Sequence, residues 1–186
     1  RKRETVLAMV ARRIHTAQTS SCGRLFDAVA SILGLRQEIN YEGQAAIELE
    51  MAAAAGVEGT YPFEIGCGEL REIDLRPLVE AVVRESASGL PASVIAARFH
   101  NTVAAVIVEV CRGLRQQEKL NRVCLSGGTF QNLYLLQRVL AGLRGDQFEV
   151  FLHTRVPPND GGISLGQAAI ANEMLCRGSP PSGPAT

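Results

Sequence analysis

The apolar residues of this chain recur mostly at helical spacing, three or four positions apart. A clear example is the stretch Ala92–Leu114, in which Ile95, Phe99 and Val103 fall on one face of a helix. The same spacing predicts helices over Thr5–Ile14, Gly23–Leu33, Ala45–Ala55, Arg76–Arg84, Ala92–Leu114, Phe130–Leu143 and Ile163–Leu175. The sequence therefore predicts a helix-rich protein in which strands are few and short.

Short segments between these helices have the apolar pattern of β-strands. Tyr61–Ile65 and Glu72–Asp74 flank Gly66-Cys67-Gly68 and predict a hairpin. Arg122–Leu125 and Phe148–Leu152 are separated by a predicted helix, so we expect them to lie parallel as a βαβ unit. The predicted fold class is α/β, helix-rich, with a small sheet that contains a βαβ unit and a hairpin.

Ser126-Gly127-Gly128 follows the strand Arg122–Leu125 directly, and a predicted helix follows the two glycines. Glycine has no Cβ, so the backbone N–H groups of such a turn can approach an anion closely. The N-terminus of the next helix adds partial positive charge at the same place. The pattern is typical of a phosphate-binding turn and equally of an ordinary connection between a strand and a helix, and spacing alone leaves both open.

A second Gly-Gly turn, Pro157–Gly162, follows the strand Phe148–Leu152 and again leads into a helix. Because ligands of open α/β sheets bind at the carboxyl ends of the strands, we expect the two turns to converge. They would then bring Asn132, after the first turn, close to Asp160 in the second. Asp160 has two interpretations, a turn or helix-cap residue and a carboxylate ligand of a cation.

Few other polar residues carry a chemical signal. Asp27 lies beside the apolar face of the helix Gly23–Leu33, either as a solvated residue that favours the helix dipole or as a ligand for a hydroxyl. The histidines His15, His100 and His153 are too far apart in sequence to predict a catalytic triad or a complete metal site. A lone His100 on a helix is more typical of a surface or core position, so the catalytic residues stay unknown.

Composition and charge mainly exclude some classes of protein and of binding partner. Lys and Arg number 19, as do Asp and Glu, so no basic excess predicts binding to nucleic acid or to an anionic membrane. The five cysteines include no Cys-x-x-Cys pair, which argues against a disulfide framework and fits a reducing, cytoplasmic compartment. The longest apolar run, Val103–Val108, is too short to span a bilayer, and the N-terminus lacks the apolar core of a signal peptide.

The two ends of the chain bear on its domain organisation. The first residue is not Met and the N-terminal segment already looks helical, so we expect a fragment of a larger protein. Residues 1–176 are predicted to form one nucleotide-binding subdomain. Residues 177–186, rich in Pro, Ser and Gly, are predicted to be a disordered tail.

Motifs in a fixed order carry a resemblance to a known family. They are Thr19–Ala30 (TSSCGRLFDAVA), Tyr41–Ala46 (YEGQAA), Leu125–Asn132 (LSGGTFQN) and Arg155–Gln167 (RVPPNDGGISLGQ). Together they resemble the C-terminal part of the hydrogenase maturation carbamoyltransferase family, HypF. The resemblance runs from about Thr19 to about Asn172, and all the motifs in order are more specific than any one alone.

The resemblance implies a nucleotide-binding fold of the actin, hexokinase and Hsp70 type (ASKHA), of which this chain would be the second subdomain. It implies that carbamoyl phosphate and ATP give a carbamoyl-adenylate, whose carbamoyl group passes to the C-terminal cysteine of a HypE-type acceptor protein. That group later becomes the cyanide ligand of NiFe-hydrogenase. Upstream domains of the same polypeptide would form the adenylate and supply paired metal-binding histidines.

The resemblance also implies roles for individual residues. Asp27 and Gly43 would contact the ribose and adenosine side of the adenylate. The phosphate side would be contacted by Gly127, Gly128 and Asn132, and Asp160 would bind a divalent metal. These roles agree with the residue chemistry, because glycines leave bare backbone for a phosphate, and carboxylates accept hydrogen bonds from hydroxyls or bind cations.

Other functions stay open beside this one. One alternative is a related O-carbamoyltransferase, which acts on a small-molecule hydroxyl. The residues of the motifs Gly23–Asp27 and Ser126–Asn132 favour HypF over this alternative. A third possibility is a non-catalytic fragment that only binds a partner, because half of the expected active site would lie upstream. For the same reason, we expect the fragment alone to be inactive.

Overall fold

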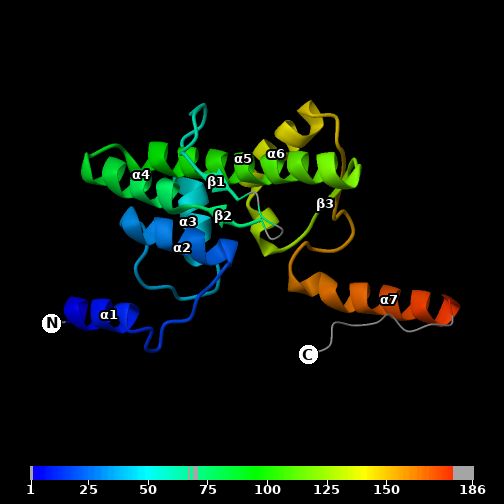
Figure 1. Ribbon diagram of the computed structural model, residues 1–186, viewed down its shortest axis with the longest axis horizontal. Helices are drawn as coiled ribbons and strands as arrows, with labels where there is room; N and C mark the ends of the chain where they lie inside the picture. The colour runs from blue at the N-terminus through cyan, green and yellow to red at the C-terminus, as the bar shows by residue number, and fades with distance from the viewer. Residues whose placement is uncertain (1, 67, 69–70, 178–186) are drawn as a thin grey trace.

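Helix α5 (Ala92–Glu118) forms the centre of the fold, and other helices pack along its length (Figure 1). The structure, a computed structural model, describes residues 2–66, 68 and 71–177. α5 is 27 residues long and buries apolar side chains together with the polar residues His100, Asn101 and Thr102. A helix buried on so much of its circumference is a core helix. The helix predicted over Ala92–Leu114 is therefore confirmed, and it extends to Glu118.

Helices from the first half of the chain cover one part of α5. They are α2 (Cys22–Ile32), α3 (Gln44–Ala52) and α4 (Arg76–Ala87); α3 and α4 pack on α5, and α2 packs on both of them. Ser21 starts α2, because its hydroxyl accepts a hydrogen bond from the N–H of Arg24. The core that these helices share includes Phe26, Leu49, Leu78 and Phe99, each no more than 2% exposed.

The predicted hairpin is present, because β1 (Glu64–Ile65) pairs antiparallel with β2 (Ile73–Asp74). Cys67, in the turn that the sequence predicts, lies outside the described residues. The prediction of one small sheet for both the hairpin and the βαβ unit is wrong, since the described residues form two separate two-stranded sheets. Apolar patterns identify strands but not their partners, and strands of two residues offer too few hydrogen bonds to extend a ladder.

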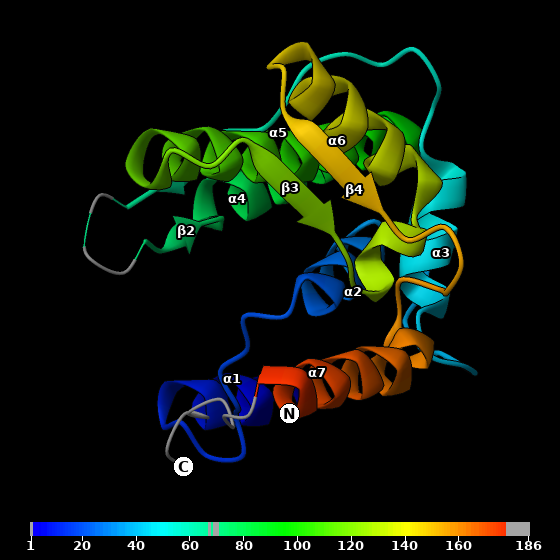
Figure 2. The same cartoon turned by 90° about the vertical axis from the view of Figure 1, so that its right-hand side faces the viewer.

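The predicted βαβ unit is confirmed. β3 (Arg122–Leu125) lies parallel to β4 (Glu149–Leu152), with Val123 opposite Val150, and α6 (Leu133–Gly145) is the crossover helix (Figure 2). α6 packs on both α5 and β4. The carboxyl ends of β3 and β4 therefore lie at the same edge, as a binding site between the following turns requires.

The crossover helix begins later than the sequence predicts. Residues Gly128–Gln131 form a short 3₁₀ helix, η1, and α6 starts at Leu133 instead of near Phe130. Asn132 has an extended backbone, with φ −69° and ψ 107°, and its side chain caps α6. The apolar spacing continues through η1, so periodicity alone does not reveal the break.

α1 (Lys2–Ala11) and α7 (Ile163–Arg177) stand below the body of the molecule in two perpendicular views (Figures 1 and 2). Neither helix has a buried residue. The large apolar side chains exposed on them are Val6, Leu7, Val10, Ile163, Leu165, Ile170 and Leu175. Arg177 is the last residue of α7, and residues 178–186 of the predicted tail lie outside the described residues.

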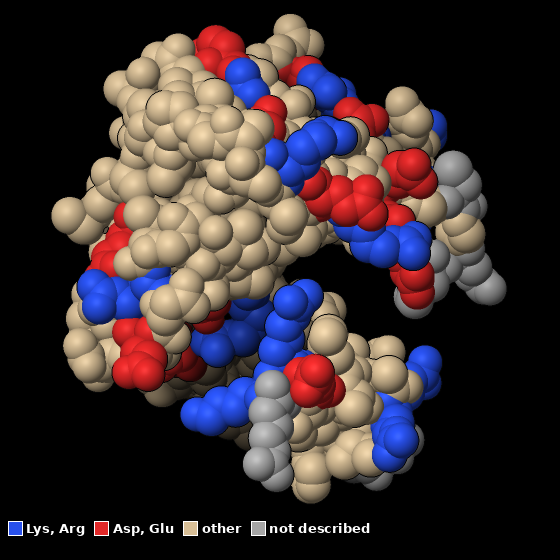
Figure 3. Space-filling model, turned by 90° about the vertical axis from the view of Figure 1, so that its left-hand side faces the viewer, with Lys and Arg blue, Asp and Glu red and all other residues tan. Residues whose placement is uncertain are grey.

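α5 is the one helix in the described chain whose length and apolar composition would suit a membrane span. However, 61% of its most apolar window is buried inside the protein, as in the core helix of a packed domain. On the face shown in Figure 3, Lys and Arg lie interspersed with Asp and Glu. The 19 basic and 19 acidic residues of the chain are thus not separated by sign on that face.

Candidate functional site

A cleft of about 860 Å³ opens where segments distant in sequence meet. They are the starts of α2 and α3, the first Gly-Gly turn with η1, and the second Gly-Gly turn with η2 (Asp160–Gly162). The residues that line it include Asp27, Gly43, Gly128, Asn132 and Asp160. The structure thus brings together all but one of the residues that the sequence singles out, and Gly127 is the neighbour of one of them. What each residue binds stays a prediction.

The first Gly-Gly turn is shaped by Gly127, whose φ of 106° and ψ of 154° suit glycine alone. The Gly127 N–H donates to the carbonyl of Pro158 at 2.7 Å, which joins the two Gly-Gly turns. The backbone amides of Gly128 and Thr129 have no acceptor within the part of the chain that the structure describes. Both residues line the cleft, so their amides are the donors of this turn that stay free for a ligand.

A carboxylate already occupies the N-terminus of α6. One oxygen of Glu50, on α3, accepts hydrogen bonds from the backbone N–H groups of Leu133 at 2.7 Å and Tyr134 at 3.1 Å. It thereby satisfies free amides of the first turn and interacts favourably with the helix dipole. The expectation that this helix end adds to a phosphate site is therefore wrong, because η1 separates the glycines from α6 and Glu50 fills the end.

Asn132 is 9% exposed, and both ends of its side-chain amide are hydrogen-bonded. Its Oδ1 accepts from the N–H of Leu135 at 2.8 Å, and its Nδ2 lies 2.9 Å from Nε2 of His100. An amide Nδ2 carries two hydrogens, so one donor of Asn132 is left for the cleft. Asn132, which the sequence predicts to bind phosphate, is thus also the cap of α6, a role that the phosphate-site pattern does not indicate.

Asp27, in α2, and Gly43, at the start of α3, also line the cleft. The Asp27 carboxylate pairs with Arg24, one turn earlier in α2, at 3.0 Å. Gly43 precedes α3 with a left-handed φ of 78°, and its carbonyl accepts from the N–H of Ile47. This backbone conformation explains why a glycine stands there, and an added Cβ would meet nothing within 4 Å, so the space at Gly43 is open.

Asp160 is exposed, and its carboxylate has no partner among the described residues. The capping side chain of η2 belongs to Asn159, whose Oδ1 accepts from the N–H of Gly161 at 3.1 Å. The helix-cap interpretation of Asp160 therefore fails, because its neighbour fills that role. The described residues contain no group of three His, Cys, Asp or Glu that could hold a metal, so Asp160 would supply one ligand of a site completed from elsewhere.

The lining of the cleft is acidic. Asp27, Glu42, Glu50 and Asp160 contribute carboxylates, and Arg24 contributes the one guanidinium among the lining residues described. These carboxylates and the phosphate of a ligand are both negative, so they repel each other, and more strongly where water is partly excluded. A cation bound together with the phosphate would reduce this repulsion and raise the affinity of the ligand.

Ser126 and His153 meet beyond the carboxyl ends of β3 and β4, with His153 Nε2 2.8 Å from Ser126 Oγ. Both side chains are exposed. The pair adds a side-chain link to the backbone link between Gly127 and Pro158. No motif connects the two residues, and the parallel register of the strands is what brings them together.

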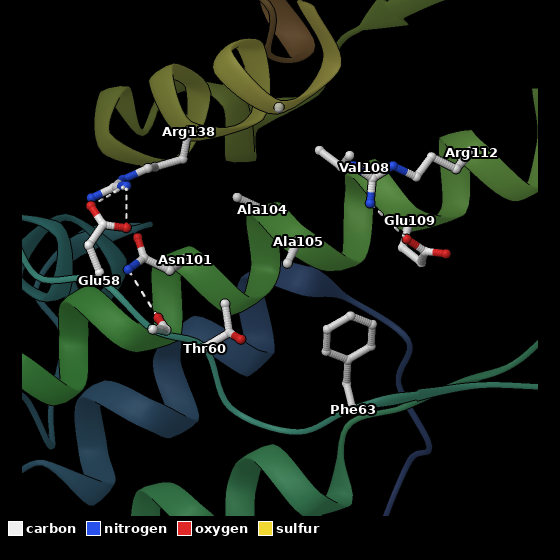
Figure 4. Close-up of a pocket in the computed structure, with 12 residues that line it drawn as sticks. Glu58, Thr60, Phe63, Asn101, Ala104, Ala105, Val108, Glu109, Arg112 and Arg138 are labelled. Atoms are coloured by element: carbon white, nitrogen blue, oxygen red, sulfur yellow. Dashed lines mark hydrogen bonds and ion pairs between the residues drawn. The ribbon is translucent and has the colours of Figure 1, made fainter. Parts of the chain in front are cut away.

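A smaller cavity of about 320 Å³ lies along α5, between α6 and the segment that precedes β1 (Figure 4). Its charged side chains are paired with one another, Glu58 with Arg138 and Glu109 with Arg112. The Asn101 amide donates to two backbone carbonyls of the same segment. Because these groups already have partners, the larger cleft is the candidate site.

Comparison with known proteins decides the family. A sequence profile described as "Carbamoyltransferase, Kae1-like Domain, second subdomain" matches residues 1–167. The chain belongs to the HypF carbamoyltransferase family. The family predicted from the sequence motifs is thus confirmed, and the Kae1-like match supports the second subdomain of an ASKHA-type fold.

Individual HypF proteins agree with this assignment. The carbamoyltransferase HypF of Synechocystis sp. is 39% identical over 163 residues, which are 85% of this chain and 20% of that protein. A crystal structure of full-length HypF in the phosphate- and nucleotide-bound form superposes with a TM-score of 0.88 at 43% identity, over 94% of this chain and 23% of that one. The structure of HypF from T. kodakarensis gives a TM-score of 0.78 at 26% identity, over 94% and 22%. This chain thus spans about a fifth of the length of these HypF proteins.

Proposed function

We propose that this chain forms the nucleotide-binding half of a HypF carbamoyltransferase active site. The observation that carries the proposal is the cleft, which gathers Asp27, Gly43, Gly128, Asn132 and Asp160 from segments far apart in sequence. A HypF of 43% identity is described in a phosphate- and nucleotide-bound form, which supports a nucleotide as the ligand.

In the proposed reaction, carbamoyl phosphate, ATP and water first give a carbamoyl-adenylate, and phosphate and diphosphate leave. The thiolate of the C-terminal cysteine of a HypE-type acceptor protein then attacks the carbamoyl carbon. The bond between that carbon and the adenylate oxygen breaks, AMP leaves, and the acceptor carries the carbamoyl group. The task of this chain is to hold the adenylate during the transfer, which is a matter of orientation more than of proton transfer.

The free donors and acceptors of the cleft suit an adenylate. The amides of Gly128 and Thr129 donate to phosphate oxygens, as bare backbone does in other phosphate sites. The second Nδ2 hydrogen of Asn132 donates beside them. The Asp27 carboxylate accepts from a ribose hydroxyl, next to the open backbone of Gly43.

A divalent metal bound by Asp160 would reduce the repulsion between the adenylate phosphate and the acidic lining. Asp160 fits this role because its carboxylate is exposed, faces the cleft and is not used as a helix cap. A hard cation near phosphate prefers oxygen ligands, and a carboxylate also supplies negative charge. The remaining ligands would come from upstream parts of the polypeptide.

The chain spans about a fifth of the HypF proteins that it matches, so we propose that the adenylate forms on upstream domains. The chain alone should then leave the acceptor unmodified when it is incubated with carbamoyl phosphate and ATP.

The cysteine pattern supports a cytoplasmic location for the whole protein.

Gly128 offers the decisive test, because its backbone tolerates a side chain while that of Gly127 does not. A Cβ on Gly128 would lie 3.9 Å from the nearest atom, Asn159 Cβ. In the full-length polypeptide, Gly128→Val should keep the fold but shield the amides, and the affinity for AMP, the group that leaves from this site, should fall about tenfold or more in titration calorimetry. Gly145→Ala, which meets nothing within 4 Å, is the control with unchanged affinity. Wild-type affinity in folded Gly128→Val would make the turn an ordinary strand–helix connection.

The acceptor needs its own experiment. The full-length protein is incubated with carbamoyl phosphate and ATP, once with a HypE-type protein and once with a small hydroxyl compound. Mass spectrometry should find the carbamoyl group on the C-terminal cysteine of the protein. Carbamoylation of the hydroxyl compound alone would favour an O-carbamoyltransferase.

A further inference from the structure

His100 lies in the middle of α5, is fully buried, and takes no part in the reaction described above. Aromatic rings enclose it, with centroid distances of 5.3 Å to Phe26, 5.7 Å to Phe99 and 5.1 Å to Tyr134. The imidazole therefore has little freedom to rotate, and its two nitrogens point in fixed directions.

Hydrogen bonds determine which nitrogen of His100 carries the proton. Nδ1 lies 2.7 Å from the carbonyl oxygen of Ala96, which can only accept, so Nδ1 must be the N–H. In the neutral ring Nε2 is then an acceptor, and its partner at 2.9 Å, the side chain of Asn132, must present a donor. Nε2 thus faces Nδ2 of Asn132 and not Oδ1.

The other end of the Asn132 amide gives the same orientation independently. Oδ1 accepts from the N–H of Leu135 at 2.8 Å, a bond that the nitrogen end cannot make. A flipped amide would oppose two donors at Leu135 and two acceptors at His100. The cap of α6 and the ring of His100 therefore fix the amide in one orientation, with a free Nδ2 hydrogen in a residue that lines the cleft.

We propose that His100 is a positioning residue of the nucleotide site, which holds the Asn132 amide so that a donor, and not an acceptor, meets the phosphate. This inference rests on the proposed function, in which Asn132 contacts the phosphate side of the adenylate. His100 itself stays in the core and touches Asn132, not the ligand.

The role requires a neutral ring, because a protonated imidazole would donate from both nitrogens and repel Nδ2. Burial lowers the pKa of His100, whereas the hydrogen bond to Ala96 and the Glu50 carboxylate on α3 act in the opposite direction. Phe26 from α2 and Tyr134 from α6 face the ring with aromatic surfaces. The surroundings of the ring therefore favour the acceptor form of Nε2.

A matched pair of substitutions separates this role from mere packing. Gln and Met have similar length and volume, but only Gln presents a strong acceptor near the position of Nε2. In the full-length polypeptide, His100→Met should weaken AMP binding about tenfold, and His100→Gln should stay within about threefold of wild type. Val139→Ala, a core truncation in α6, controls for lost stability and should leave the AMP affinity unchanged.

A double-mutant cycle with Asn132→Ala decides the outcome. If His100 acts through Asn132, His100→Met should cause no further loss of AMP affinity in the Asn132→Ala background. Additive losses, or equal losses in His100→Gln and His100→Met, would overturn the inference. If His100→Met does not fold, His100→Gln still decides, because a loss of about tenfold in that folded variant contradicts the proposed role.

The same cycle distinguishes failure of the inference from failure of the proposed function. Wild-type AMP affinity in folded Asn132→Ala would remove Asn132 from the nucleotide site, and the inference would fall with it. A loss in Asn132→Ala without a loss in His100→Met would overturn the inference alone.

Discussion

Val108 on α5 packs so closely against Gly142 on α6 that a Cβ added to Gly142 would lie 2.7 Å from Val108 Cγ2. Real Cβ atoms almost never approach another atom so closely, and the branched side chain of Val108 is stiff in a helix. The close contact lets the crossover helix lie against the central helix, and so it sets the position of Asn132 at the other end of α6.

We expect Gly142→Ala to lower the free energy of unfolding by about 1–3 kcal/mol, because overpacking outweighs a gain of up to about 1 kcal/mol in helix propensity. Urea unfolding would measure it. In a Val108→Ala background the same change should be neutral or stabilising, since the clash is gone. Gly145→Ala, with nothing within 4 Å, is the matched control. Equal stabilisation by both alanines would show that the contact is not tight.

Glu50 should contribute to stability through the start of α6. Glu50→Gln keeps an acceptor for the amides of Leu133 and Tyr134 but loses the charge, so we expect a loss of about 0.3–1 kcal/mol. Glu50→Ala also leaves the amides without their acceptor, and the loss should reach about 1–2 kcal/mol. Glu42→Ala, at an exposed carboxylate of the same cleft, should change nothing. Thermal melting is the check, and Glu42→Ala should be the most stable of the three variants, followed by Glu50→Gln and then Glu50→Ala.

His100 should make the fold sensitive to mild acid. Burial lowers its pKa in the folded protein, whereas the pKa of a histidine in an unfolded chain is about 6.5. The unfolded state then binds more protons below that value, so the contribution of His100 is complete above pH about 6.5 and is lost as the pH falls. The free energy of unfolding, measured at pH 7.5 and pH 5.5 or thereabouts, should fall more in wild type than in His100→Gln. The same fall in both proteins would contradict this assignment.

Asp160→Asn should separate metal binding from folding. Because Asn159 supplies the cap of η2, loss of the Asp160 charge should leave the melting temperature of the full-length protein close to wild type. We expect bound metal and carbamoyl transfer to be lost together, as measured by elemental analysis and by the mass of the acceptor. Glu42→Gln removes another carboxylate of the cleft and should retain both. Normal metal content and transfer in Asp160→Asn would make Asp160 a turn residue.

The sequence predicted the helices, the hairpin and the βαβ unit because each depends on local apolar spacing. It missed the separation of the two sheets, which depends on contacts between distant segments. It also missed the break before α6, because the cap at Asn132 interrupts the backbone without interrupting the apolar pattern.

The candidate site divides in a similar way. Gly128 and Asp160 could be recognised because turn glycines and a carboxylate at strand ends carry a local signal. Glu50 could not, since it lies 83 residues before Leu133, the residue whose amide it binds. His100 looked like an ordinary core residue, and only the tertiary contact with Asn132 gives it a further role.

The acidic lining of the cleft has a thermodynamic consequence. In the proposed site, a cation weakens the repulsion that the nucleotide phosphate meets from the carboxylates of Asp27, Glu42, Glu50 and Asp160, and the phosphate in turn adds to the attraction on the cation. Their affinities are then linked, and linkage is reciprocal, so the factor by which the metal tightens nucleotide binding equals the factor by which the nucleotide tightens metal binding. Loss of either ligand therefore weakens the binding of the other, and an enzyme depleted of metal would release its nucleotide more readily than the number of lost contacts suggests.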